Sequence, residues 1–246
     1  MAILASKESG KILIGNFNRI QKISKKSPHE LVTNVDILCE KKIISILSKK
    51  FPSYSIQAEE SGSHDNGSDF KWVIDPLDGT HSYIYGLPTF GVSIALEYRK
   101  KIVLGVVCIP FTKETFHAVR GSGAFENNKK ISVSGERFLK DSMMFFGGPF
   151  FDRDKFGNFS KVAPKVKRVR INGSAVFSIC YVAKGKAEFY LDETNKYHDY
   201  AASALILQEA GGRTTDLKGK NWEKGITKVL ASNGLVHDQI LNLLGD

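Results

Sequence analysis

The segment Lys71-Trp-Val-Ile-Asp75-Pro-Leu-Asp78-Gly79-Thr80-His81 is the most informative stretch of this sequence. Its apolar run 72–74 predicts a buried strand that carries Asp75 at its carboxyl end, and the following proline predicts a sharp turn. The turn would aim Asp75 and Asp78 at one point, and Gly79-Thr80 would open a short helix whose free backbone N–H groups attract an anion. Carboxylates for cations beside amides for an anion are what phosphoryl transfer requires, although Asp-Pro-x-Asp-Gly also occurs as a plain surface turn.

Two further acidic segments also lie at the end or the start of a predicted strand or helix. Glu59-Glu60-Ser61 follows a strand predicted at 54–56 and precedes a loop, 61–69, whose Gly, Ser and Asn content predicts mobility. Asp199 stands ahead of an apolar helical stretch that ends at Gly211-Gly212. Taken alone, Asp199 is also a favourable residue for a helix cap or first turn.

The hydrophobic pattern divides the chain into two halves, 1–140 and 141–246, with the change near 135–142. The first fifty residues predict two helices, the second beginning at Thr33-Asn-Val-Asp36. They are followed by an antiparallel sheet with strands near 72–74, 90–96, 102–109, 115–119 and 131–133. In the second half, strands are predicted near 143–146, 166–171, 187–191, 212–215 and 229–231, and helices near 153–163, 174–183, 200–210 and 236–244. The sequence therefore predicts a layered α/β (α+β) protein of about five layers, forming one compact unit.

Composition excludes several other classes of protein. Hydrophobic residues make up 42% and charged residues 25% of 246 residues, as in ordinary globular proteins. Apolar runs fall short of the ~20 residues that a membrane helix needs, and no export signal is visible, so we expect a cytoplasmic protein without membrane contact. The net charge of +9 lies in scattered lysine pairs, which argues against a nucleic-acid partner. An odd number of dispersed cysteines argues against a disulfide framework: Cys39, Cys108 and Cys180.

These motifs together resemble the inositol monophosphatase family of magnesium-dependent, lithium-sensitive phosphatases. The segments that match the family's motifs occur in order between about residues 25 and 233: Lys26-Ser27-Pro28 through Leu31-Val32-Thr33 to Asp36, Glu59-Glu60-Ser61, Trp72 to Thr80, Gly173-Ser174-Ala175 with Tyr181-Val182-Ala183, and Asp199-Tyr-Ala-Ala202 followed by Glu209-Ala-Gly211-Gly212. The resemblance implies the five-layer αβαβα sandwich shared with fructose-1,6-bisphosphatase. It also implies a homodimer.

The resemblance implies a role for each matching residue. Glu59, Asp75 and the Leu77 carbonyl would bind one Mg²⁺, and Asp75, Asp78 and Asp199 a second; two or three ions per site are expected, and Mn²⁺ can substitute. Thr80, with Asp36 behind it and Glu59 beside it, would orient the attacking water. The residues that would contact the phosphate and the leaving group are Asp78, Gly79, Thr80, Gly173, Ser174, Ala175, Asp192 and Asp199. All-oxygen ligation suits a hard cation rather than zinc.

The expected reaction is hydrolysis of a small phosphorylated polyol or sugar by direct in-line attack of water, without a phosphoenzyme. Inositol 1-phosphate is the first substrate expected, with fructose 1,6-bisphosphate as a second. Two departures leave the leaving-group pocket open: His198 stands where Trp is common, and Asp192 stands where inositol-specific members carry Glu. Histidinol phosphate or 3′-phosphoadenosine 5′-phosphate are alternative substrates. A non-catalytic regulator associated with RNA or RNA polymerase is the alternative of another class.

Overall fold

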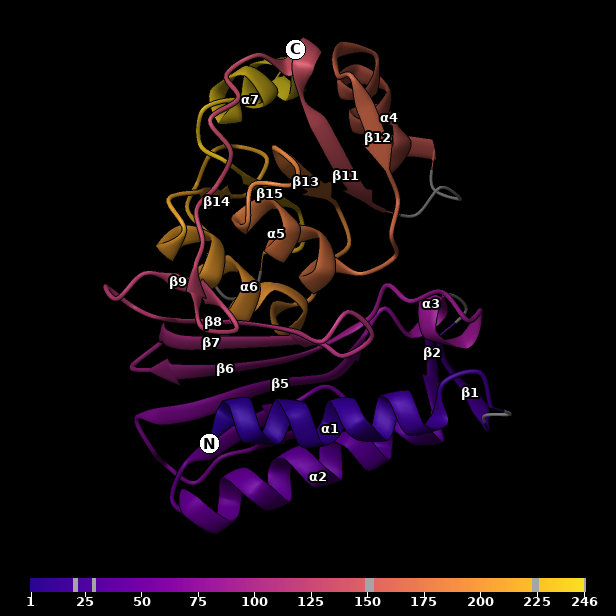
Figure 1. Ribbon diagram of the computed structural model, residues 1–246, viewed down its shortest axis with the longest axis vertical. Helices are drawn as coiled ribbons and strands as arrows, with labels where there is room; N and C mark the ends of the chain where they lie inside the picture. The colour runs from indigo at the N-terminus through magenta and orange to yellow at the C-terminus, as the bar shows by residue number, and fades with distance from the viewer. Residues whose placement is uncertain (20–21, 28–29, 149–152, 223–225, 246) are drawn as a thin grey trace.

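A computed structural model of the chain describes residues 1–19, 22–27, 30–148, 153–222 and 226–245, the side chains of 153–155 excepted. The elements stack in five layers, a helix pair, a large sheet, a helix pair, a small sheet and a further helix pair (Figure 1). The predicted αβαβα architecture is therefore confirmed. The division into halves at residue 140 stays a prediction, and Pro28 of the N-terminal motif lies outside the described residues.

The first layer consists of α1 (Ala2–Asn16) and α2 (Asn34–Lys50). The second helix begins where the sequence predicted, because Thr33 caps it: its Oγ1 accepts from Val35 N at 3.1 Å, and Asp36 Oδ2 accepts from Thr33 N at 2.9 Å. The expectation that the first fifty residues are helical was wrong in part. A hairpin of β1 (Ile23–Ser27) and β2 (Glu30–Thr33) separates the helices, and its exposed β1 and half-buried β2 leave no clear apolar periodicity to reveal it.

The second layer is an eight-stranded sheet in the order β10-β9-β8-β7-β6-β5-β3-β4. All neighbouring strands are antiparallel except β3 and β5, so the prediction of an all-antiparallel sheet needs this correction. Its strands are β3 (Ser55–Ala58), β4 (Gly62–His64), β5 (Phe70–Asp78), β6 (Gly91–Tyr98), β7 (Lys101–Ile109), β8 (Glu114–Val119), β9 (Ala124–Glu126) and β10 (Lys129–Lys130).

Two local predictions in this sheet were wrong. The segment 131–133 is not a strand, because its backbone N–H groups donate to two different segments: Ile131 N to Ala124 O and Val133 N to Ala210 O. The segment 61–69 contains β4, which pairs with β3 through its backbone and needs no apolar side chains to do so. Backbone pairing of this kind leaves little trace in the hydrophobic pattern.

The middle layer consists of α5 (Ala175–Ala183) and α6 (Tyr197–Glu209), which lie between the two sheets (Figure 1). Eight of the nine residues of α5 and nine of the thirteen of α6 are buried, as a helix covered on two faces requires. A β-carbon at Gly105 of β7 would lie 2.5 Å from the Ala202 carbonyl oxygen. Glycine there lets α6 approach the large sheet closely, and α6 begins three residues earlier than predicted.

The fourth layer is a mixed sheet in the order β12-β11-β13-β15-β14. In it β11 runs parallel to β12 and β13, and the other pairs are antiparallel. The outer helices α4 (Arg153–Val162) and α7 (His237–Gly245) complete the fifth layer. The strands of this sheet are β11 (Met143–Gly147), β12 (Arg168–Arg170), β13 (Phe189–Asp192), β14 (Arg213–Thr215) and β15 (Val229–Ser232).

Candidate active site

Strand β5 continues through Asp75 to Asp78, so the sharp turn predicted at Pro76 is absent. Asp75 pairs with Ser93 of β6 and Asp78 with Gly91, which leaves two residues opposite one. This irregularity is a β-bulge, where a proline is tolerated because it owes no ladder hydrogen bond. Asp75 and Asp78 both line the same cavity, and the short helix α3 (Thr80–Ile84) follows as predicted.

The cavity has a volume of about 570 Å³ and lies at the end of the large sheet next to β2 and α3. It collects Glu59, which directly follows β3, and residues from β5, the N-termini of α5 and α6, and the end of β13. All but one of the residues predicted for the site line it: Glu59, Asp75, Leu77, Asp78, Gly79, Thr80, Gly173, Ser174, Ala175, Asp192 and Asp199. The exception, Asp36, is fully buried behind Thr80.

Four carboxylates gather in this cavity, and their charges oppose one another. Burial, then the charges of Glu59, Asp78 and Asp199, raises the pKa of Asp75 well above its usual range. Burial also raises the pKa of Asp78 to about 7, and burial followed by the charge of Asp78 raises that of Asp199. Ionising all four groups together therefore requires a positive partner.

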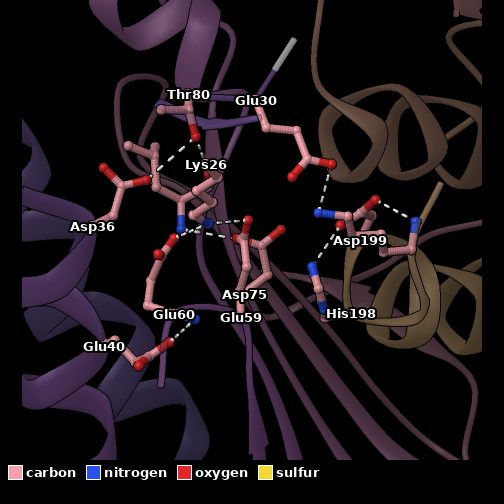
Figure 2. A network of polar contacts seen from close by, with 12 residues as sticks. Lys26, Glu30, Asp36, Glu40, Glu59, Glu60, Asp75, Thr80, His198 and Asp199 are labelled. Carbon is pink, nitrogen blue, oxygen red and sulfur yellow. Dashed lines mark hydrogen bonds and ion pairs between the residues drawn. The ribbon is translucent and has the colours of Figure 1, made fainter. Parts of the chain in front are cut away.

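Protein donors hold these carboxylates in the structure (Figure 2). Lys26 Nζ lies 2.8 Å from Glu59 Oε1 and 2.5 Å from Glu60 Oε1. Burial opposes ionisation of Glu59, but the hydrogen bond and charge of Lys26, the charge of His198 and a hydrogen bond with Asp75 together outweigh it, so the Glu59 pKa lies below its usual range. Among the described residues, no three acidic, His or Cys side chains converge as a preformed metal site.

The donor set nevertheless fits a hard cation. It consists of carboxylates and a backbone carbonyl; the described residues that line the cavity include no thiol and one histidine, His81 of α3, but not His198. His198 Nε2 lies 3.2 Å from Asp199 Oδ1 (Figure 2). Oxygen donors of this kind bind Mg²⁺ or Mn²⁺ in proteins. Mutual repulsion among Asp75, Asp78 and Asp199 is the feature that a cation would relieve.

Thr80 is placed as a positioning residue would be. Its Oγ1 lies 3.0 Å from the Leu77 carbonyl oxygen and 3.3 Å from Asp36 Oδ1 (Figure 2). The other Asp36 oxygen accepts from Thr33, so α2 fixes this carboxylate from behind. Burial raises the pKa of Asp36.

Gly79 is required by the local backbone. Its φ of +88° lies in the left-handed region, and a β-carbon there would lie 2.8 Å from the Thr89 carbonyl oxygen. The Ser174 hydroxyl bonds to Asp78 Oδ2 and also accepts from Phe177 N, so it caps α5 while holding Asp78. Val176 N donates to the same Asp78 oxygen at 3.1 Å.

Asp192 lines the same cavity from the end of β13. It is 6% exposed, and burial raises its pKa to about 6. Tyr190 hydroxyl donates to its Oδ2 at 2.5 Å, and Thr194 N donates to its Oδ1 at 2.7 Å. These bonds fix the carboxylate while leaving it on the cavity wall.

Sequence reasoning gave no role to three residues that shape the site. Lys26 was quoted only as part of a motif, and Asn195, which is 4% exposed, lines the cavity unnoticed. Glu40 accepts from Glu60 N and Ser61 N at 2.8 Å and so holds the end of β3 (Figure 2). The sequence could have indicated Glu40, because it follows Asp36 by four residues and therefore lies on the same, buried face of α2.

Comparison with known proteins agrees with this site. The model of the family described as "Inositol monophosphatase family" matches residues 1–245. The chain belongs to the inositol monophosphatase family. A Thermotoga maritima protein named fructose-1,6-bisphosphatase/inositol-1-monophosphatase is 34% identical over 96% of this chain and 91% of its own length.

Other members of the family carry a different name. The Haemophilus influenzae protein named Nus factor SuhB is 34% identical over 98% of this chain and 93% of its own length. The crystal structure of extragenic suppressor protein suhB from Bartonella henselae superposes with a TM-score of 0.95 at 33% identity, over 98% of this chain and 96% of that one. The family thus supports a phosphatase, while its members' names leave the substrate open. No helix among the described residues is long and apolar enough to cross a membrane.

Proposed function

We propose that this protein is a Mg²⁺-dependent phosphomonoesterase that hydrolyses inositol 1-phosphate, with fructose 1,6-bisphosphate as a second substrate. The observation that carries the proposal is the meeting of Glu59, Asp75, Asp78 and Asp199 in one cavity beside the Gly79-Thr80 backbone. These carboxylates come from three separate segments. A protein that only binds a partner would gain nothing from placing such mutually repelling groups together.

Each residue of the cavity has a distinct task in this proposal. Glu59, Asp75, the Leu77 carbonyl, Asp78 and Asp199 would hold the cations, which supply charge neutralisation and a more acidic bound water. Thr80, held by Asp36 and the Leu77 carbonyl, orients the attacking water through its hydroxyl. Water then attacks phosphorus in line with the leaving oxygen, and no protein nucleophile takes part.

The substrate would be oriented from two sides. Gly79 and Thr80 N–H groups face the phosphate, and the start of α5 at Gly173, Ser174 and Ala175 borders the leaving group. Asp192 accepts hydrogen bonds from hydroxyl groups of the polyol. Its buried, hydrogen-bonded position supports this role, because a fixed acceptor discriminates between ligands better than a mobile one.

A panel of phosphate esters tests the proposal. Purified protein with Mg²⁺ should turn over inositol 1-phosphate with a higher kcat/KM than histidinol phosphate or 3′-phosphoadenosine 5′-phosphate. Excess EDTA should abolish turnover, and restored Mg²⁺ or Mn²⁺ should recover it. Full turnover in EDTA would refute the metal-dependent reaction, whereas preference for another ester would refute only the substrate.

A regulator associated with RNA or RNA polymerase is the second candidate, favoured by relatives named Nus factor SuhB. The Asp78→Asn variant separates the two, since it removes a cavity charge and leaves the basic surface unchanged. The regulator would be favoured by two results together: the Asp78→Asn variant still binds RNA or RNA polymerase, and the wild-type protein shows no phosphatase activity. Homodimerisation and inhibition by lithium are further expectations from the family, which light scattering and a lithium titration address.

A further inference from the structure

A second cavity, of about 670 Å³, lies at the opposite end of the large sheet. Its lining includes Lys100 and Lys101 at the turn between β6 and β7. That turn is five residues along β6 from Ser93, the partner of Asp75, which corresponds to ~17 Å of strand. Figure 1 shows this end of β6 on the side of the sheet away from β2 and α3. The second cavity is therefore separate from the candidate active site.

Four basic side chains from three segments line the second cavity. Besides Lys100 and Lys101, Arg120 follows β8 directly and Arg213 begins β14. None of the lining residues that the structure describes is acidic. The fold thus collects positive charge here from positions more than a hundred residues apart in the sequence.

This charge is only partly neutralised. Arg213 pairs with Asp238 at 2.7 Å, but the Asp238 side chain is 77% exposed, so solvent screens the pair. Arg120 Nε donates to the Ile102 carbonyl oxygen at 2.8 Å, a neutral partner. Within the described part of the chain, neither Lys100 nor Lys101 has an ion-pair partner.

Acidic groups on the neighbouring elements are engaged elsewhere. Glu97 of β6 accepts from the Tyr197 hydroxyl at 2.8 Å, and Lys71 lies 3.9 Å from its other oxygen. Glu209 at the end of α6 accepts from Gly121 N and Gly123 N. The four cations consequently face the cavity with their charge available to a ligand.

Two local features also point to a ligand. Arg99 and Lys100 both adopt positive φ, 47° and 65°, at a turn where Asn and Gly are the usual residues. Backbone of this kind costs free energy and concentrates at functional sites. Thr214, which lines the cavity and is 4% exposed, has an Oγ1 without a hydrogen-bond partner among the described residues.

We propose that this cavity binds a small anion bearing a phosphate or pyrophosphate group. Arginine guanidinium groups present paired N–H donors that match phosphate oxygens, and lysine ammonium groups add charge at the rim. The Thr214 hydroxyl supplies a buried donor that such an oxygen would satisfy. The active-site cavity has the opposite charge, so it would bind an anion only together with cations, whereas the basic cavity would bind one without them.

Inorganic pyrophosphate is the probe, titrated by calorimetry in excess EDTA. Without cations the active-site carboxylates repel an anion, whereas the basic cavity keeps its charge. The wild-type protein should bind about one equivalent, and fluorescence of Trp222, which lines the cavity, should change in parallel. The double variant K100E/K101E should raise Kd at least ~10-fold, the scale of one charged hydrogen bond.

The matched control is K41E/K42E, which changes the net charge equally at two exposed positions of α2. It should bind pyrophosphate like the wild type, and so should Asp78→Asn. Equal weakening in K41E/K42E would show a general charge effect, and tighter binding by Asp78→Asn would place the anion in the active site, where this change removes a repelling charge; either result overturns the proposal. Absence of saturable binding by the wild type overturns it as well. If K100E/K101E does not fold, K101Q provides the same comparison with K41Q.

Discussion

At the scale of single residues, Asp78 is the clearest example of a side chain with one structural and one proposed chemical task. Two hydrogen bonds to its side chain, from Ser174 Oγ and from Val176 N, end on Oδ2. Asparagine keeps one carbonyl oxygen that can accept the same two bonds. The charge of Asp78 and its contribution to folding can therefore be separated by one substitution.

We predict that Asp78→Asn folds like the wild type and retains less than a tenth of the wild-type kcat. The loss follows because the change removes a negative charge from a site that binds a hard cation. Thermal unfolding and steady-state turnover at saturating Mg²⁺ provide the two measurements. Turnover above a tenth of wild type would show that Asp78 serves the bulge and not the reaction.

Asp192 provides the residue-scale test of substrate. Asp192→Ala should lower kcat/KM for inositol 1-phosphate by ~1.5–3 kcal/mol in transition-state free energy, the scale of a charged hydrogen bond. On para-nitrophenyl phosphate, whose leaving group has no such hydroxyls, the loss should be much smaller. Tyr190→Phe is the control, because it removes a donor to Asp192 and keeps the carboxylate. Equal losses on both esters would remove Asp192 from the substrate pocket.

At the scale of elements, α7 is anchored to the small sheet through one buried histidine. His237 Nε2 lies 2.9 Å from Thr215 Oγ1 of β14, and Nδ1 lies 2.8 Å from Ser232 Oγ of β15. Burial, assisted by the charge of Arg213, lowers the pKa of His237 to about 4. The neutral imidazole thus joins three elements, and protonation opposes that arrangement.

The contribution of His237 to stability should therefore depend on pH. Because its pKa is lower in the folded state, the unfolded chain gains a proton first, and the free energy of unfolding falls as pH decreases from about 6.5 to about 4. The full effect is ~3 kcal/mol at 1.36 kcal/mol per pKa unit. Denaturant unfolding of wild type and His237→Gln at several pH values isolates this term as a difference.

His64→Gln is the control for this experiment, since the His64 side chain is exposed. Its pH profile of stability should follow the wild type. The buried carboxylates of the active site act in the opposite direction, because a raised pKa favours folding as pH falls, and they cancel in the comparison. A His237→Gln profile parallel to the wild type between pH 6.5 and 4 would contradict the prediction.

At the scale of the whole molecule, the active-site cavity joins three of the five layers. Its carboxylates come from the large sheet and from α6, and Asp192 comes from the small sheet. A cation bound among them would connect these layers and relieve the repulsion that raises the pKa values of Asp75, Asp78 and Asp199. Metal binding should for this reason be visible in global stability.

We predict that Mg²⁺ raises the thermal unfolding midpoint relative to EDTA at matched ionic strength. A ligand at 100 times its Kd adds ~2.7 kcal/mol, which corresponds to several degrees for a chain of this size. Asp78→Asn should lose most of this shift because it loses a ligand charge. A Mg²⁺ shift of equal size in wild type and variant would place the cation outside the cavity.

The sequence alone predicted the layered architecture, the start of α2 and the acidic segments of the candidate site, whereas the roles of the individual site residues followed from the family resemblance and stay predictions. Apolar periodicity predicted the buried strands and helices, because the burial of one face of an element directly requires an apolar residue at each buried position. The site residues were found because each acidic motif ends or begins a buried element, where its position is fixed. Their assignment to a family rested on resemblance, since Asp199 taken alone was an ordinary first-turn residue.

Only the tertiary structure decided the features that depend on distant partners. The β1–β2 hairpin, the parallel pairing of β3 with β5 and the bulge at Pro76 depend on backbone hydrogen bonds, which every residue can form. The Lys26 contacts with Glu59 and Glu60 and the basic cavity bring together side chains far apart in sequence. Local periodicity records burial but not which charges meet, so these contacts become visible only after the chain is folded.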